Sequence, residues 1–467
     1  MGSALFLRQL GHEVVLAEKF TRLGALVRGF KRQGLTFETG FHYAGGLDED
    51  GVLYHYLRKL RLFRHGLRTC PLPDPGGEFL RFPESGTDFA LPRSLDEFGR
   101  QLPGLPEIHD FFRRSAAVFR RSPYLNREIE TFDPLVFYNH GETLAASLDR
   151  LPVSQTLKSV LGFRCLLYGA KPSEASFDQF SLVNVPYLNG GRTFEGGGQA
   201  LIEAFEAALR EAGVTVLTGM EVIGLKTDRH NTAVAAICKT PGGDCEISFD
   251  CCVYSGSPVA LPRLLPEGAL RPVLTRRLAG LKYTPSPLLV FGKIKSNWLE
   301  NRQLFICPDR LENWFDPARK AIYASGGPGR DGLWPVSAVA LLPEGATAPW
   351  CAAGYGSEQG YRALKERLAE ETRIHLLSHC PELGGDLEIV DSATDLTFGR
   401  YSLNFGPGIY GKLHSVNEAP ILPVTRVGRL ALAGQNIVMP GLLGVLVSSA
   451  LAAGSLFGHQ TVLEALK

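Results

Sequence analysis

The sequence lacks paired cysteines and an excess of charge of either sign. Its nine cysteines are odd in number, scattered and without a Cys-x-x-Cys pair. Neither a disulfide framework nor a zinc site is therefore indicated, and reduced thiols in a cytoplasm are expected. With 49 Lys and Arg residues against 48 Asp and Glu residues, the net charge is +1. A nucleic-acid-binding protein would have a basic excess, so no polyanionic partner is expected.

A leader peptide and a membrane-spanning segment are also not indicated. Arg8 and Glu13 interrupt the apolar centre that a signal peptide would need near its start. Residues 437–457 carry no charge, and their length would allow them to cross a bilayer. Because Pro440, Gly441 and other small or polar residues dilute this stretch, we expect a buried helix rather than a membrane span.

Helix and strand patterns alternate in three separated blocks. At 467 residues with 45% hydrophobic side chains, the chain is long enough for two domains. Each block combines apolar residues at helical spacing with a short β-branched or apolar run, and glycines separate the two. The predicted helices cover 3–10, 201–211 and a segment from 442 onward, and the predicted strands cover 14–18, 214–217, 249–254 and 430–433.

The end of the first predicted strand carries a carboxylate, Glu18. In a dinucleotide-binding fold, a carboxylate at this position accepts hydrogen bonds from the ribose hydroxyls of the adenosine. The alternative is a solvated glutamate at a strand end. No Gly-x-Gly-x-x-Gly loop precedes the opening helix within the chain. We therefore expect the first strand and the glycine loop upstream of Met1, and weaker dinucleotide binding without them.

Several phrases, taken in order, resemble one family. The N-terminal phrases are Glu18-Lys19, Gly24-Ala25 and the run Phe-Glu-Thr-Gly-Phe-His-Tyr-Ala-Gly-Gly at 37–46; the C-terminal ones lie in 433–454. Together they are similar to the phytoene desaturases, carotenoid isomerases and all-trans-retinol saturases, a family of FAD-dependent oxidoreductases. Glycines 196–198 and the phrase at 400–415 also look like that family. The resemblance covers nearly the whole chain.

The resemblance implies a set of FAD-binding residues. The helix that begins near Leu442 would direct its N-terminal amides at the flavin, where they would stabilise the negative charge of the reduced ring. Ala25 stands where relatives have a second glycine. Because alanine has a Cβ, close approach of the backbone to the flavin is in question at this position. The implied cofactor-binding residues are Glu18, Lys19, Gly24, Ala25, Val222, Gly434, Gln435, Asn436, Pro440, Gly441, Leu442, Leu443 and Gly444.

The resemblance also implies the chemistry. Flavin N5 would exchange a hydride with a carbon of an apolar polyene, a retinoid or a carotenoid, while the protein positions the chain. His42 and Tyr43 are the candidate catalytic residues, although a histidine among aromatic residues is more often part of a core. The direction stays open among saturation, desaturation and isomerisation, and the Thr-Gly-x-His-Tyr phrase favours reduction of the retinol-saturase type. No metal site is expected.

The implied fold is α/β, with a discontinuous Rossmann-like FAD-binding domain and an interleaved α+β substrate domain. The first domain would comprise 1–66, 186–262 and 400–467, without its first strand and glycine loop, and the second 67–185 and 263–399. We expect a cytoplasmic protein, peripheral on the inner membrane surface. Its electron partner and oligomeric state stay open. The alternatives are a flavin amine oxidase and a non-catalytic polyene-binding relic that has lost FAD.

Overall fold

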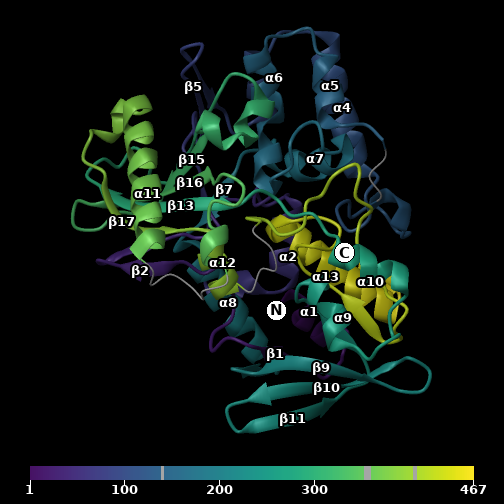
Figure 1. The fold of residues 1–467 in the computed structure, drawn as a ribbon. Helices are drawn as coiled ribbons and strands as arrows, with labels where there is room; N and C mark the ends of the chain where they lie inside the picture. Colours follow the sequence, from purple (N-terminus) through teal and green to yellow (C-terminus); the bar gives the residue numbers. More distant parts are fainter. Residues whose placement is uncertain (138–140, 352–358, 403–407) are drawn as a thin grey trace.

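The computed structural model describes residues 1–137, 141–351, 359–402 and 408–467. Figure 1 shows two groups of elements, one above the other. The upper group is built on a seven-stranded sheet, and the lower group on short parallel strand pairs covered by helices.

Two parallel strand pairs form the centre of the lower group. Strand β1 (Val15–Glu18) pairs with β8 (Thr215–Thr218), and β12 (Cys252–Tyr254) pairs with β18 (Leu430–Leu432). A helix precedes both β1 and β8, as expected for parallel strands, which need a crossover between them. The helices of this group are α1 (Gly2–Gln9), α2 (Val52–Lys59), α8 (Gly197–Glu211), α9 (Leu261–Leu264), α10 (Pro272–Ala279), α13 (Gly441–Phe457) and α14 (His459–Leu466).

An antiparallel sheet in the order β11-β10-β9 forms the lower edge of the molecule in Figure 1. Its strands are β9 (Glu221–Thr227), β10 (Ala233–Thr240) and β11 (Gly243–Ser248). The prediction of one strand over 249–254 is wrong in its first half. The Phe249 amide donates to Val234 O beside this antiparallel sheet, and β12 begins only at Cys252.

Helix α8 begins four residues earlier than predicted, at Gly197 instead of Leu201. The glycines therefore form the first turn rather than a loop before it. Gly197 has φ +62°, and a Cβ there would lie 1.9 Å from Glu38 Oε1. Only glycine allows this approach, which explains why such poor helix formers open the helix.

The seven-stranded sheet of the upper group has the order β17-β13-β16-β15-β14-β5-β6. Strands from two regions nearly two hundred residues apart meet at the parallel contact between β5 and β14, whereas the other contacts are antiparallel. The strands are β5 (Glu78–Phe82), β6 (Thr87–Leu91), β13 (Pro287–Ile294), β14 (Gln303–Ile306), β15 (Ile322–Gly326), β16 (Trp334–Leu341) and β17 (Glu388–Ala393).

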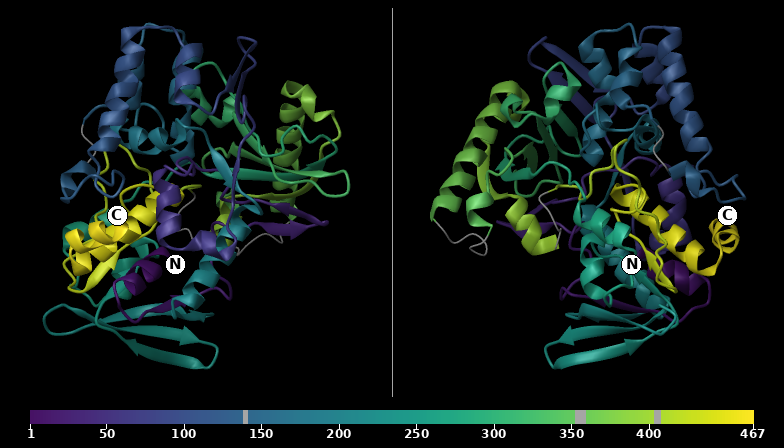
Figure 2. Two further views of the ribbon diagram at one scale, coloured as in Figure 1. Left: turned by 180° about the vertical axis from the view of Figure 1, so that it is seen from behind. Right: turned by 45° about the vertical axis from the view of Figure 1, so that its right-hand side comes forward.

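Helices lie on two sides of this sheet (Figures 1 and 2). The long α11 (Gln359–His379) packs against β13 and β17. The group α4 (Pro106–Arg120), α5 (Leu144–Asp149), α6 (Gln155–Gly162) and α7 (Phe177–Asn184) lies at the other end. Smaller elements complete this part: β2 (Phe30–Arg32), β3 (Leu35–Phe37), β4 (Thr69–Pro71), β7 (Arg192–Phe194), α3 (Leu95–Gln101) and α12 (Asp395–Ser402).

Helix α13 is buried along most of its length, which confirms the expectation for 437–457. It packs against α1, α14 and β18. Small residues allow the close contact with α1, since a Cβ on Gly2 would lie 3.0 Å from Leu446 Cδ2. Across the described ranges, no helix combines the length and the apolarity that crossing a membrane requires.

The division into two domains stays a prediction. Helix α9 packs against β9 of the lower group, and α10 lies beside α13 in Figure 1. We therefore propose that the second part of the substrate domain begins just before β13 rather than at residue 263.

Candidate functional site

The start of α13 is an open helix N-terminus that follows a strand end. The N-cap residue Pro440 makes no side-chain capping bond, and Gly441 has φ +80° with open space where a Cβ would lie. Strand β18 leads to Gly434, which has φ +107° and whose amide donates to Ser448 Oγ at 2.9 Å. An uncapped helix start has free amides and a partial positive charge, so it favours an anionic or hydrogen-bond-accepting group.

The segment at 408–415 packs against the residues that follow Gly434. The Lys412 amide donates to Asn436 Oδ1 at 2.8 Å, and His414 Nε2 lies 3.3 Å from Gln435 O. A Cβ on Gly411 would lie 2.5 Å from Asn436 Oδ1. This contact gives a structural role to a phrase whose purpose the sequence left open. Gly406 and Pro407 lie outside the described residues.

Glu18 ends β1 beside the start of α1. Its Oε1 accepts from the Phe20 amide at 2.9 Å. Lys19 forms an exposed ion pair with Glu221 at 2.7 Å, next to Val222 on β9. The end of β1 and the start of β9, which are expected to hold the adenosine half of FAD, are thus linked by this ion pair.

Gly24 requires glycine for two reasons. It has φ +76°, and a Cβ there would lie 2.3 Å from Ile202 Cδ1 of α8. The neighbouring Ala25 is half-buried. The tight contact is therefore made at the first position of the pair, whereas this chain has alanine at the second.

His42 and Tyr43 follow β3 and point to different partners. His42 Nδ1 lies 2.9 Å from Ser325 Oγ of β15, and its ring meets Tyr323 edge-on with 5.2 Å between centroids. The Tyr43 hydroxyl donates to Glu78 Oε1 at 2.8 Å. The β-sheet of the upper group therefore holds both candidate catalytic side chains.

Behind Tyr43 lies a buried ion pair that the sequence reasoning did not identify. Arg164 Nη2 lies 2.5 Å from Glu78 Oε2, and the two side chains are 8% and 4% exposed. Arg164 also donates from Nη1 to Asn184 Oδ1 at 2.9 Å, and its guanidinium lies 5.5 Å from the centre of the Tyr187 ring. Such a buried pair needs these extra hydrogen bonds to offset its desolvation.

A sequence signal for this pair does exist. Glu78 stands at a buried position of β5, whose residues alternate between buried and half-buried, and Arg164 interrupts the apolar run 163–168. A charged residue at a buried position of an apolar pattern is rarely left without a partner. The sequence alone does not show which partner it has.

Burial sets the protonation state of both candidate catalytic groups. It lowers the pKa of His42 to about 4, so this imidazole is neutral at neutral pH. Burial, together with the Glu78 carboxylate, raises the pKa of Tyr43 well above 10. Neither side chain is therefore a strong acid at neutral pH, which favours positioning roles over proton donation.

The residues present fit FAD at this site. The α13 N-terminus and Gly434 give free or closely approachable backbone, and Glu18 gives the carboxylate expected for a ribose. In the part of the chain that the structure describes, no group of His, Cys, Asp and Glu residues could hold a metal ion.

Comparisons with known proteins agree with this geometry. The all-trans-retinol 13,14-reductase of Danio rerio is 22% identical over 98% of this chain and 84% of its own length. The 4,4'-diaponeurosporene oxygenase of Staphylococcus aureus is 22% identical over 49% of this chain and 48% of its own. These relatives confirm the resemblance inferred from the motifs.

The fold class is likewise confirmed. A solved oxidoreductase from Methanosarcina mazei has a TM-score of 0.64 at 14% identity, over 96% of both chains. The sequence profile of the family described as flavin containing amine oxidoreductase matches residues 3–323. The chain therefore belongs to this family and is an FAD-dependent oxidoreductase.

Proposed function

We propose that the protein transfers a hydride between FAD and a carbon–carbon double bond of an apolar polyene, a retinoid or a carotenoid. The observation that carries this proposal is the similarity to a retinol reductase over 98% of this chain. The half-length similarity to a carotenoid-type oxygenase supports the same substrate class.

The surroundings of His42 support an apolar, conjugated substrate. Tyr43 and Tyr187 meet edge-on at 5.2 Å between centroids, and His42 and Tyr323 do the same. Aromatic faces and a neutral imidazole suit a polyene better than a charged substrate. We propose that His42 contacts the reacting part of the polyene. Tyr43, hydrogen-bonded to Glu78, would form the side of the substrate site behind His42. Solvent would supply any proton.

Bound FAD supplies the hydride chemistry, and the chain supplies orientation and charge. We propose that Glu18 and Lys19 face the ribose, that Val222 contacts the adenine through its backbone, and that Gly24 and Ala25 allow close approach. The remaining proposed FAD-binding residues surround the start of α13: Gly434, Gln435, Asn436, Pro440, Gly441, Leu442, Leu443 and Gly444.

Product analysis tests this function. FAD-loaded protein is incubated with all-trans-retinol or with a carotenoid, under a reductant in one arm and an oxidant in the other. We expect a product heavier or lighter by two hydrogens, or a geometric isomer, that requires both protein and FAD. Conversion of amines to aldehydes without any change in the polyenes would overturn the proposal.

Oxidation of an amine is the second candidate, because the family description names amines. Tyr187 and its neighbours could in principle contact an amine cation through their ring faces. The guanidinium of Arg164, however, already lies 5.5 Å from the Tyr187 ring. Because this guanidinium already lies over the ring, the contacts favour the uncharged polyene. A non-catalytic relic is set aside because the chain belongs to an enzyme family.

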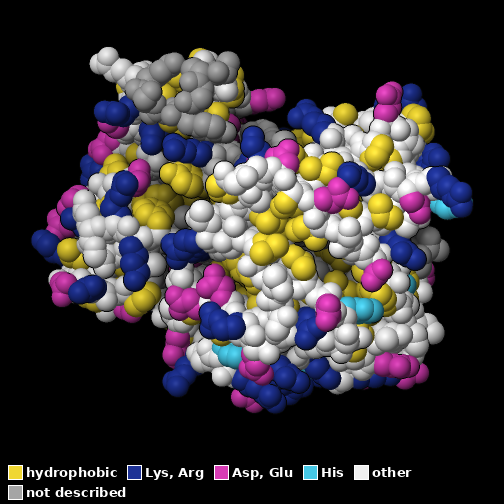
Figure 3. Space-filling view, turned by 90° about the horizontal axis from the view of Figure 1, so that it is seen from below, with side chains coloured by type: hydrophobic (Ala, Val, Ile, Leu, Met, Phe, Trp, Pro, Cys, Tyr) yellow, Lys and Arg dark blue, Asp and Glu magenta, His cyan; other side chains and the backbone are white. Residues whose placement is uncertain are grey.

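We further propose that the protein docks peripherally on a membrane, where a water-insoluble polyene is found. Figure 3 shows hydrophobic side chains gathered across the middle of the lower face, with charged side chains around them. On the strands of the lower group, Val15, Val216 and Ile223 are exposed. We expect high salt or carbonate to release the protein from membranes. Extraction by detergent alone would contradict peripheral docking.

A further inference from the structure

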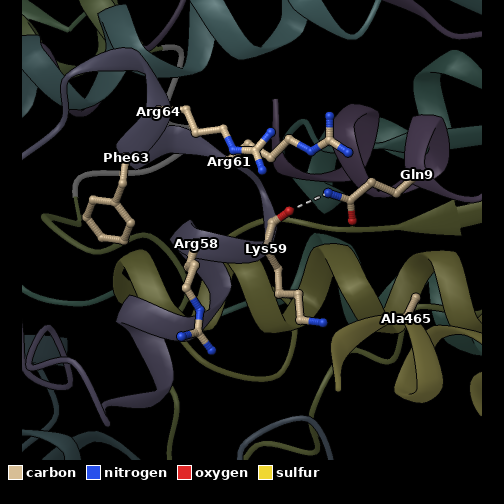
Figure 4. A pocket seen from close by; sticks show the side chains of 7 residues that line it. All are labelled: Gln9, Arg58, Lys59, Arg61, Phe63, Arg64 and Ala465. Carbon is tan, nitrogen blue, oxygen red and sulfur yellow. Dashed lines mark hydrogen bonds between the residues drawn. The ribbon is translucent and has the colours of Figure 1, made fainter.

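A pocket lined by four basic side chains lies between α1, α2 and α14. Its volume is about 420 Å³. Figure 4 shows Arg61 and Arg64 extending side by side toward Gln9, while Lys59 extends toward Ala465. The lining residues are Gln9, Arg58, Lys59, Arg61, Phe63, Arg64 and Ala465.

Carboxylates balance only part of this charge. Glu211 lies 3.6 Å from Arg61 and 3.0 Å from His65. Arg58 donates to the neutral acceptor His55 Nδ1 at 3.2 Å rather than to an acid. Within the described ranges, no carboxylate oxygen is recorded within 4.0 Å of the side-chain nitrogens of Lys59 or Arg64. The pocket therefore has an excess of positive charge.

Backbone hydrogen bonds hold the turn that carries these side chains. The Arg61 amide donates to Arg58 O at 2.9 Å, and the Arg64 amide donates to Arg61 O at 3.1 Å. Gln9 Nε2 donates to Lys59 O at 2.6 Å, so this carbonyl at the end of α2 is already paired. Arg61 has φ +63°, a conformation that glycine adopts far more readily than arginine.

We infer that this pocket binds a phosphate-bearing anion. Guanidinium and ammonium groups that line one pocket can bind phosphate through charge-assisted hydrogen bonds, and the anion would offset the repulsion among the cations. The phosphate comes from a soluble molecule or from a lipid headgroup, and both present the same chemistry to the pocket. This inference goes beyond the proposed function and does not depend on it.

The test uses FAD-loaded protein, so that phosphate does not compete for the α13 N-terminus. Inorganic phosphate is titrated by calorimetry at low ionic strength. The Lys59→Glu/Arg64→Glu variant reverses two charges in the pocket, and the control Arg319→Glu/Arg362→Glu makes the same change in net charge at exposed positions elsewhere. We expect the pocket variant to bind phosphate at least about tenfold more weakly, and the control to bind as the wild type does.

A second arm identifies the source of the phosphate. The same proteins are sedimented with vesicles of phosphatidylcholine, with and without phosphatidylglycerol. Binding of free phosphate that the pocket variant loses supports a soluble ligand, and loss of binding to anionic vesicles alone supports a lipid headgroup. If neither probe binds, or if the pocket variant binds both as the wild type does, the inference is overturned. Circular dichroism establishes that the variants are folded.

Discussion

Glu38 is a buried carboxylate beside the glycines that open α8. Its Oε2 accepts from the Gly198 amide at 3.2 Å. Burial outweighs this bond and raises the pKa of Glu38 from 4.5 to about 7. The folded state therefore holds the proton more tightly than the unfolded state. The stability gained from the protonated carboxyl is complete below pH 4.5 and is lost as the pH rises through 7.

We predict that Glu38→Gln removes this pH dependence. The free energy of unfolding of the variant should exceed that of the wild type at pH 8, by up to about 3 kcal/mol, and the difference should shrink toward pH 5. Urea unfolding at a series of pH values measures this difference in the free energy of unfolding. A variant with the same pH profile as the wild type would show that Glu38 is well solvated.

Glu18→Ala tests the proposed ribose contact. If the carboxylate accepts charge-assisted hydrogen bonds from FAD, its loss should weaken FAD binding by roughly 1.5 to 3 kcal/mol. Quenching of flavin fluorescence gives the dissociation constant. Glu13→Ala, an exposed change near the same strand, is the matched control and should leave the constant unchanged. Equal affinities for wild type and Glu18→Ala would return Glu18 to a solvated strand end.

Glu78→Gln tests the buried pair behind Tyr43. The substitution keeps the shape of the side chain but leaves the Arg164 charge without its counter-ion, so we expect a loss of about 3 to 5 kcal/mol in the free energy of unfolding. Glu382→Gln is the control, because Glu382 pairs with Arg81 at 2.8 Å and is 32% exposed. The free energy of unfolding should fall clearly less in this control. If the two variants lose similar amounts of unfolding free energy, burial does not make the Glu78–Arg164 pair more important than the exposed pair.

Among the elements, α13 is linked to Gly434, just after β18, by one hydroxyl. Ser448 Oγ accepts from the Gly434 amide and donates to Val445 O, both at 2.9 Å. Ser448→Ala leaves the Gly434 amide without this partner and should cost about 1 to 3 kcal/mol of stability. FAD affinity should fall as well, because Gly434 is proposed to contact the cofactor.

Ser455→Ala is the matched control on the same helix, since Ser455 Oγ donates only to Leu451 O of its own helix. It should change neither unfolding nor FAD affinity appreciably. If both variants behave alike, the contact with Gly434 does not position the site.

Sequence patterns predicted the short elements near the site well. Helix α1 and strands β1, β8 and β18 lie within one or two residues of the prediction, because glycines and apolar spacing mark their ends locally. The start of α8 was wrong because Glu38, more than 150 residues away in the chain, decides it. The seven-stranded sheet was not predicted, since its order depends on pairing between β5 and β14.

The candidate site residues also fall into two groups, those that local sequence patterns indicate and those that depend on contacts between distant parts of the chain. Those in recognisable motifs, such as Gly434 and His42, are proposed because the motifs themselves resemble a family. Glu78 and Arg164 were missed because their ion pair joins β5 to the 3-10 helix (Phe163–Tyr168) that follows α6, and no local pattern encodes that contact. Their burial beside Tyr43, not their spacing, makes them candidates for the site.

At the scale of the whole molecule, the lower group provides the proposed FAD-binding residues and the upper sheet provides the proposed polyene wall. His42 and Tyr43 follow the small β2–β3 pair and contact Ser325 and Glu78 of the large sheet. This arrangement predicts that the redox state of the flavin responds directly to a polyene.

Anaerobic absorbance spectroscopy of the bound flavin tests that claim most directly. FAD-loaded protein is mixed in single turnovers with all-trans-retinol or a carotenoid, starting once from reduced and once from oxidised flavin, and benzylamine is the comparison. We predict that a polyene reoxidises the reduced flavin or reduces the oxidised one, with a matching change in polyene absorbance, and that benzylamine does neither. Reduction of the flavin by benzylamine, with no response to any polyene, would contradict it.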